Sequence, residues 1–116
     1  MYGACIAEVE VDLGTGQKTV VDISQANDVG HAFDKEEVIG QINGGLVMDL
    51  GYGLFEDIET RKGTIKNLNF DSYLIPTAMD IPELKTVVIE EPGPFGPFGA
   101  KGLGEPTACL VLLQLL

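Results

Sequence analysis

The sequence is poor in the side chains that build metal clusters and disulfide frameworks. Its 116 residues contain no tryptophan, one histidine and two cysteines; Cys5 and Cys109 lie near opposite ends of the chain and form no CxxC motif. These are too few for a zinc site or an iron–sulfur cluster built by this chain alone. Nothing resembling a secretory signal precedes the cysteines, so we expect reduced thiols and a cytoplasmic location.

Basic residues and long apolar runs are also scarce. Seven Lys and Arg residues stand against 18 Asp and Glu residues, which gives a formal net charge of −11. Phosphate backbones are bound by basic side chains, so we expect no nucleic-acid partner. The longest apolar stretch, residues 108–116, is interrupted by Gln114 and is far shorter than the roughly 20 residues of a membrane-spanning helix. We therefore expect no membrane partner either.

The length of the chain fits one domain, residues 1–116. The sequence nevertheless stops inside the apolar segment, without a helix C-cap, a basic last turn or a polar tail. Hydrophobic residues make up 45% of the chain, which is high for so much net charge. These observations predict a fragment, or a split subunit that completes its core with another chain, and they predict an oligomer.

Two kinds of β-structure are predicted from local patterns. Residues 5–12 alternate between apolar and polar side chains, and residues 20–23 form a second β-rich run beyond a Gly-containing turn, so the two runs predict a hairpin. A second turn at Gly63 separates two shorter β-like segments, and residues 84–90 predict a further strand.

A glycine-rich amphipathic helix is predicted between these β-segments. Asp34 followed by Glu37 is an acidic variant of the helix-start signature, and apolar residues then recur at three-to-four spacing as far as Leu54. Five glycines interrupt this helix, each costing about 1 kcal/mol relative to alanine, so we expect other groups to pack against its bare backbone. A further helix is predicted to begin at Pro106, and the fold class that results is α+β.

The glycine-rich loop that ends at Glu105 is the first candidate site. It contains neither the GxGxxG pattern nor the Walker pattern of nucleotide-binding proteins. Because Glu105 directly precedes Pro106, it is predicted to lie at a helix entrance, where the positive helix end favours an ionised carboxylate. Such a carboxylate can be a general base or can simply cap the helix, and the residues alone leave both interpretations open.

Gln41 is the second candidate. Its amide can both donate and accept hydrogen bonds from a position near the start of the predicted helix, between Gly40 and Gly44. The two interpretations are contact with a ligand or another backbone, and a solvated polar residue.

Taken together, five segments resemble one family, in order and at similar spacing. They are EVEVDLGTGQ, NDVGHAF, GQINGGLVMDLGYGLFED, NFDSYLIPTAMDIPEL and EEPGPFGPFGAKGLGEP. Nearly the whole chain is similar to the C-terminal part of the molybdenum-binding subunit of the xanthine dehydrogenase and aldehyde oxidase family of molybdenum hydroxylases. The resemblance implies that residues 1–116 are the C-terminal segment of a molybdenum-cofactor-binding domain.

The resemblance also implies roles for particular residues. Glu105 matches the catalytic base of the family, which removes a proton as oxygen attacks an electron-poor carbon of a purine, aldehyde or N-heterocycle. Gln41 matches a residue that hydrogen-bonds the molybdopterin cofactor. By position, the backbone of four residues lies close to the metal site: Lys101, Gly102, Leu103 and Gly104. No metal ligand on this chain is implied.

Partners follow from the same resemblance. The chain is expected to work with the remaining molybdopterin-binding segment and with Fe–S clusters and FAD carried by other domains or subunits, on a small-molecule substrate. We expect the isolated chain to be inactive. The alternative is a non-catalytic, stand-alone binding or assembly module that keeps the fold and self-associates.

Overall fold

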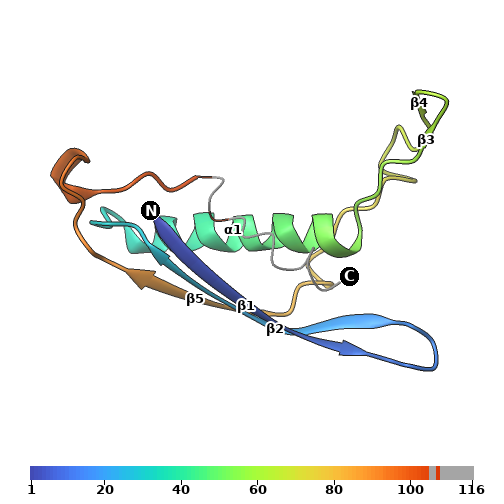
Figure 1. Ribbon diagram of the computed structural model, residues 1–116, viewed down its shortest axis with the longest axis horizontal. Coiled ribbons are helices and arrows are strands. Elements are labelled where there is room, and N and C mark those ends of the chain that lie inside the picture. The colour runs from blue at the N-terminus through green and yellow to red at the C-terminus, as the bar shows by residue number, and fades with distance from the viewer. Residues whose placement is uncertain (105–106, 108–116) are drawn as a thin grey trace.

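A computed structural model describes residues 1–104 and residue 107 of the chain. One long helix lies across one face of a three-stranded sheet, and a slender arm extends beyond the end of the helix (Figure 1). This arrangement confirms the predicted α+β fold. In chain order the elements are β1 (Tyr2–Val11), β2 (Lys18–Asp28), α1 (Lys35–Leu54), β3 (Thr60–Arg61), β4 (Thr64–Ile65), β5 (Glu83–Ile89) and the short 3-10 turn η1 (Pro97–Gly99).

The sheet has the order β1-β2-β5, with β2 at its centre. β1 and β2 form the predicted antiparallel hairpin, paired from Tyr2 opposite Asp28 to Val11 opposite Lys18. β5 pairs with β2 in parallel, from Asp22 opposite Glu83 to Asp28 opposite Ile89. Parallel neighbours need a crossover, which α1 and the arm provide here. The carboxyl ends of β2 and β5 therefore meet at the same edge of the sheet.

The helix α1 begins where the sequence predicts. The backbone of Asp34 is extended, and its side chain accepts hydrogen bonds from the backbone amides of Glu36 at 2.9 Å and Glu37 at 3.2 Å. This N-cap satisfies two of the amide groups that a helix start leaves without partners.

The core lies between α1 and the centre of the sheet. Ile42, Leu46 and Leu50 repeat at four-residue spacing, are at most 1% exposed, and pack with Ile23 of β2. Apolar side chains at this spacing share one face of a helix.

Glycines of α1 divide into two groups. A Cβ on Gly45 would lie 2.3 Å from the Oγ1 atom of Thr107, and one on Gly51 would lie 2.3 Å from a carboxylate oxygen of Glu56. The expectation that other groups pack against the bare helix is therefore confirmed at these two positions. Gly40 and Gly44 are different, because they are exposed and, outside their own helix backbone, no atom of the described residues lies within 4 Å of a Cβ built on either.

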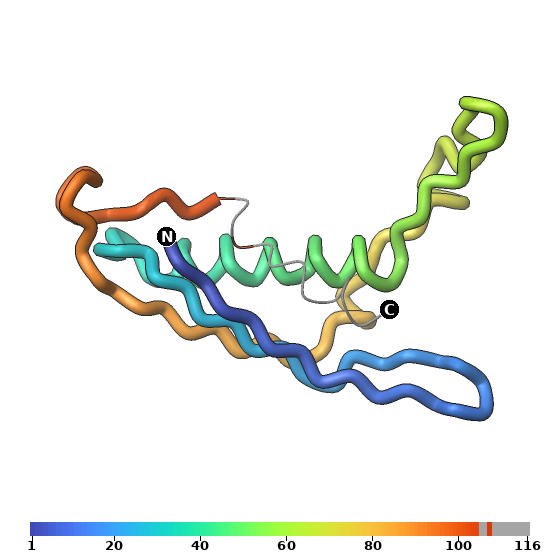
Figure 2. The backbone as a smooth tube through the Cα atoms, in the orientation of Figure 1, coloured from blue at the N-terminus to red at the C-terminus, as the bar shows by residue number. Residues whose placement is uncertain are grey.

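The arm that follows α1 is seen clearly as a projecting hairpin in the backbone trace (Figure 2). It contains β3 and β4, joined by a turn in which Lys62 and Gly63 have φ values of 51° and 78°. The predicted turn at Gly63 is confirmed. At the base of the arm the hydroxyl of Tyr73 donates to Glu56, and this hydrogen bond raises the pKa of Tyr73 to about 12.

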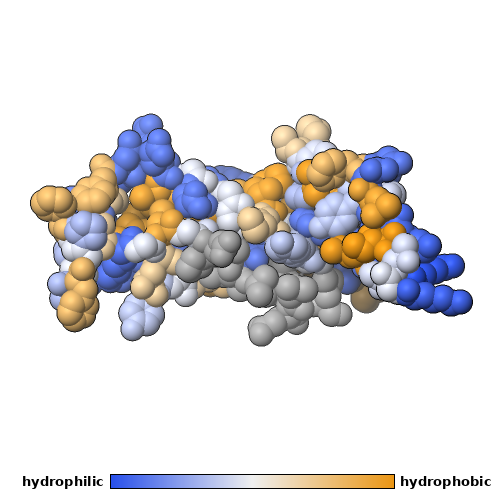
Figure 3. All heavy atoms as spheres, turned by 90° about the horizontal axis from the view of Figure 1, so that it is seen from above, coloured by the Kyte–Doolittle hydropathy of each residue, from blue (hydrophilic) through white to orange (hydrophobic). Residues whose placement is uncertain are grey.

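The arm exposes apolar side chains. The exposed residues include Ile58, Leu68 and Phe70, at 58%, 74% and 77%. Figure 3, seen from above, shows hydrophobic residues at this end of the molecule beside hydrophilic ones. Within residues 1–104 and 107, no helix is long and apolar enough to cross a membrane. The helix predicted from Pro106 through residues 108–116 lies outside the described residues.

Candidate functional site

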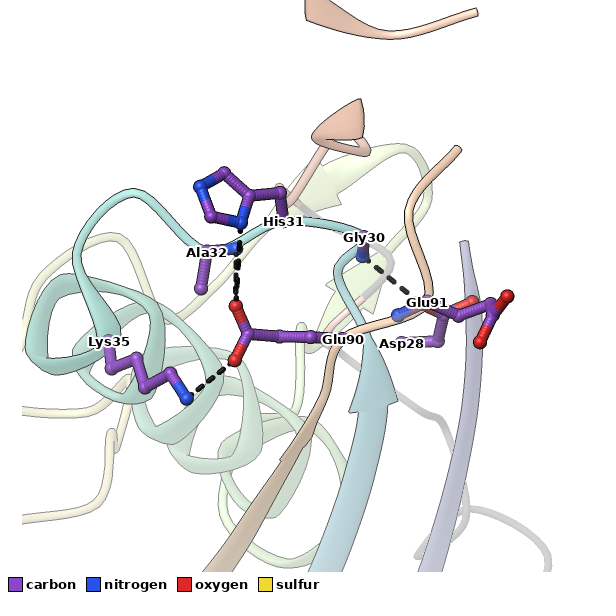
Figure 4. A network of polar contacts seen from close by, with 7 residues as sticks. All are labelled: Asp28, Gly30, His31, Ala32, Lys35, Glu90 and Glu91. Carbon is purple, nitrogen blue, oxygen red and sulfur yellow. Dashed lines mark hydrogen bonds and ion pairs between the residues drawn. The ribbon is translucent and has the colours of Figure 1, made fainter. Parts of the chain in front are cut away.

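Four segments meet at the edge of the sheet where β2 and β5 end. They are the two strand ends, the connection from β2 into α1, and the loop of residues 93–104 (Figures 1 and 4). In sheets with parallel strands, ligands bind in the crevice beyond the carboxyl ends of the strands. The sequence places its Gly-rich loop at this edge because β5 leads directly into it.

Backbone hydrogen bonds hold the loop against the residues that follow β2. The amide of Lys101 donates to the carbonyl of Val29 at 2.9 Å, and the amide of His31 donates to the carbonyl of Gly99 at 3.1 Å. Gly30 lies between these two bonds with a φ of 70°, and a Cβ there would lie 2.2 Å from the Gly99 carbonyl oxygen. Only glycine allows this approach, so Gly30 fixes how closely the loop lies against the end of β2.

Asp28, the last residue of β2, reinforces this contact through its side chain. One carboxylate oxygen is paired with the ammonium group of Lys101, and the other accepts from the amide of Gly30 at 3.0 Å. The side chains of Asp28 and Lys101 are only 13% and 20% exposed. The hydrogen bonds from Lys101 and Gly30 hold the pKa of Asp28 below its usual value. Asp28 is therefore a charged anchor for the loop.

A second carboxylate anchors the start of the helix. Figure 4 shows the side chain of Glu90, just after β5, turned toward Ala32, His31 and Lys35. It accepts from the amide of Ala32 at 3.0 Å and pairs with Lys35 at 2.5 Å, while Nδ1 of His31 lies 3.8 Å away. Lys35 and then the Ala32 amide lower the pKa of Glu90. The connection from β2 to α1 is thus tied to the end of β5.

An open pocket of about 520 Å³ lies between the start of α1 and the loop. Its lining residues include Val29, His31, Phe33, Asp34, Val38, Lys101 and Leu103. Leu103 also packs against the hydrophobic core. The lining mixes apolar side chains with ionisable ones, a combination that small-molecule sites also have.

Of the candidate residues predicted from the sequence, the structure places Lys101 and Leu103 in the lining of this pocket. Val38 lines it as well, and Gln41 follows Val38 by three residues on the same helix, with its side chain exposed. Residues three apart are neighbours on a helix surface. Among the described residues, no atom beyond the chain neighbours lies within 4 Å of a Cβ built on Gly102 or Gly104, and Gly102 is exposed. Glu105 lies outside the described residues.

Sequence reasoning missed a set of buried polar residues. Gln25 and Thr107 are each 1% exposed, and the Gln25 amide donates to the carbonyl of Thr107 at 2.7 Å. The Thr107 hydroxyl donates in turn to the carbonyl of Gly104 at 2.8 Å. The sequence did contain a sign of these buried polar residues. The inward-facing positions of β2 change from apolar Ile23 to polar Gln25 and Asn27.

The side chains that could ligate a metal are dispersed. Among residues 1–104 and 107, no group of three or more His, Cys, Asp or Glu side chains is placed to hold a metal ion.

The chain matches known proteins over most of its length. The family described as "Molybdopterin cofactor-binding domain" matches residues 1–82. The aldehyde oxidoreductase of Megalodesulfovibrio gigas is 41% identical over 106 residues, covering 90% of this chain and 11% of the relative. The xanthine dehydrogenase molybdenum-binding subunit of Escherichia coli O157:H7 is 33% identical over 107 residues, covering 90% of this chain and 14% of the relative.

Solved structures match as well. Quinoline 2-oxidoreductase from Pseudomonas putida 86 superposes with a TM-score of 0.88 at 32% identity, over 96% of this chain and 14% of that chain. Aldehyde oxidoreductase from Desulfovibrio gigas gives a TM-score of 0.82 at 39% identity, over 92% of this chain and 12% of that chain. The chain therefore spans about one seventh or less of the length of these relatives.

Proposed function

Since this chain belongs to the molybdopterin cofactor-binding domain family of the molybdenum hydroxylases, we propose that it is a segment of the molybdenum-binding subunit of a xanthine dehydrogenase or aldehyde oxidase-like enzyme. The enzyme would hydroxylate a purine, aldehyde or N-heterocycle at an electron-poor carbon. We assign residues 1–116 to the C-terminal segment of the cofactor-binding domain, so the other parts of the site come from the rest of the subunit.

The described residues fit a polar organic cofactor such as molybdopterin. Gln41 presents an exposed amide on the first half of α1, and the neighbouring positions Gly40 and Gly44 are exposed as well. Gly102 of the loop is also exposed. We propose that Gln41 hydrogen-bonds the cofactor, and that the backbone of residues 101–104 lies against the molybdenum site. When bound, the cofactor supplies the redox chemistry and accepts the electrons of the substrate.

We assign the proton transfer to Glu105. Its carboxylate would remove a proton as the attacking oxygen adds to the substrate carbon, which requires a base held in a fixed position. One observation carries this proposal: the residues on either side of positions 105 and 106 are held in place. Leu103 packs against the core, and both the amide and the hydroxyl of Thr107 donate to the carbonyl of Gly104.

Partners follow from the proposed segment. The remaining molybdopterin-binding segment would complete the site, and Fe–S and flavin groups on other domains or subunits would carry electrons away. Relatives bear names that describe them as subunits, such as the gamma subunit of the 6-hydroxypseudooxynicotine dehydrogenase complex of Paenarthrobacter nicotinovorans. We also propose an oligomer in the cytoplasm. The family match favours this enzyme segment over the alternative of a stand-alone assembly module.

The test is Glu105→Gln in the complete enzyme assembly, because glutamine keeps the shape of the side chain and cannot act as a base. We expect the turnover number per molybdenum to fall by about 10²- to 10⁴-fold, the usual contribution of a general base. Glu59→Gln, at an exposed position near β3, is the matched control and should leave turnover unchanged. Full activity in Glu105→Gln at normal molybdenum content would refute the assignment.

A further inference from the structure

We propose that β2 positions the segment carrying Glu105 from both sides, with Asp28 holding Lys101 and Gln25 holding Thr107. The inference rests on the proposed function, because only there is Glu105 a catalytic base. Asp28, Lys101 and Gln25 are then positioning residues for the hydroxylation, and the role of the Lys101 side chain is to orient the loop.

The anchor before Glu105 combines an ion pair with backbone hydrogen bonds. The ammonium group of Lys101 is directed to Asp28, and only 20% of the Lys101 side chain is exposed. Asp28 is itself fixed by the Gly30 amide, and the Lys101 amide is fixed by the Val29 carbonyl. Both the backbone and the side chain of Lys101 are therefore bound to the end of β2, four residues before Glu105.

The anchor after Glu105 is a buried hydrogen bond. The Gln25 amide donates at 2.7 Å both to the Thr107 carbonyl and to the side-chain oxygen of Asn27. Asn27 is fully buried, so the Gln25 amide is held on the inward face of β2. Thr107 lies two residues after Glu105 and packs closely on Gly45 of α1.

These anchors are needed because the stretch between them contains two glycines. Gly102 and Gly104 give this stretch more backbone freedom than any other residue type would. A catalytic group that is displaced by about 1 Å can lose about a hundredfold in rate. The ion pair and the amide hydrogen bond restrict that freedom where a base has to be placed.

A second Asp–Lys pair that also begins from β2 provides the control. Asp22 of β2 and Lys85 of β5 are paired at 2.7 Å, but their side chains are more exposed, at 27% and 55%. This pair joins the two strands at a distance from the loop, since Asp22 lies opposite Glu83 at the beginning of β5. A variant that lacks the Asp22–Lys85 pair therefore shows the effect of losing a similar ion pair that does not hold the loop.

The experiment compares Lys101→Met with Lys85→Met in the complete enzyme assembly. The kinetic measurements are the turnover number per molybdenum and the KM for the substrate. A separate measurement follows hydrogen exchange in peptides covering residues 96–104. For Lys101→Met we expect turnover to fall by about 10- to 100-fold with KM changed less than about threefold, because the base is misplaced while substrate contacts remain. Exchange in residues 99–104 should become at least about tenfold faster. Lys85→Met should change neither.

Three results would overturn the proposal. One is unchanged turnover in Lys101→Met, and another is reduced turnover without faster exchange, which would mean that Lys101 acts directly on cofactor or substrate. The third is an equal effect in Lys85→Met. If Lys101→Met does not assemble with molybdenum, Asp28→Asn gives the same comparison, because asparagine keeps an oxygen for the Gly30 amide. If the wild-type enzyme does not hydroxylate, the proposed function fails, while the exchange data still decide whether the ion pair holds the loop.

Discussion

Asp49 is the buried charge whose replacement tests the packing of α1 most directly. It lies on the inward side of the helix, is 3% exposed, and neither of its carboxylate oxygens has a hydrogen-bond partner among the described residues. Burial without partners disfavours the ionised form of a carboxyl group. Burial accordingly raises the pKa of Asp49 from 3.8 to about 6.

The sign of the effect on stability follows from this shift. A folded chain with the higher pKa binds the Asp49 proton more tightly than the unfolded chain does, so its free energy of unfolding falls as the pH rises between about 4 and 6. At about 1.4 kcal/mol per pKa unit, the full shift corresponds to about 3 kcal/mol above pH 6. Because the effective dielectric constant of protein sites is higher than that of a dry interior, we use the smaller figure of about 1–2 kcal/mol.

Asp49→Asn removes the charge and keeps the shape. We expect the variant to be more stable than wild type by about 1–2 kcal/mol at pH 7, and equal to it within about 0.5 kcal/mol at pH 4, where Asp49 is itself neutral. Urea unfolding of the 116-residue chain at several pH values, followed by circular dichroism, measures the difference. Asp57→Asn, at an exposed position, makes the same charge change and is the control.

A direct titration completes the test. Carbon NMR of the side-chain carboxyl groups should show Asp49 titrating near pH 6. A midpoint near 3.8, or equal stability of wild type and Asp49→Asn at pH 7, would refute the reasoning.

Three further predictions concern the same helix, and urea midpoints measure all of them. Asp34→Ala removes the N-cap and should lower the free energy of unfolding by about 1 kcal/mol, whereas Asp34→Asn keeps a cap; equal losses in the two variants would contradict the capping role. Gly44→Ala should stabilise the chain by roughly 0.5–1 kcal/mol, because the position is open. Gly45→Ala should destabilise it by about 1–3 kcal/mol, because a Cβ would lie 2.3 Å from Thr107, and a Gly45→Ala chain as stable as wild type would contradict that contact.

Local signals were sufficient to predict most elements of the fold. The β1–β2 hairpin, the helix start at Asp34 and the turn at Gly63 each depend on residues close together in the sequence, and all three are confirmed. The strand predicted at residues 84–90 is observed as Glu83–Ile89. Its parallel pairing with β2 was not predicted, because it joins residues about 60 positions apart and no local pattern specifies such a partner.

The candidate site was predicted only where motifs identify it. Glu105 and Gln41 were chosen by their neighbours in the sequence and by family resemblance, and their roles stay predictions. Asp28 and Gln25 were missed because their partners, Lys101 and Thr107, lie 73 and 82 residues further along the chain. A lone Asp at a strand end resembles any turn residue, and a lone Gln in a strand resembles a solvated one, until the pairing of β2 is known.

The central strand therefore connects the core to the site. Ile23 of β2 packs against α1, two residues later Gln25 holds Thr107, and Asp28 at the strand end holds Lys101. A loop with little stiffness of its own can then present a side chain accurately, because its geometry is set by a strand that is paired on both sides. Under the proposed function, it follows that changes in β2 should alter turnover, and that glycine in the loop is compatible with a fixed catalytic group.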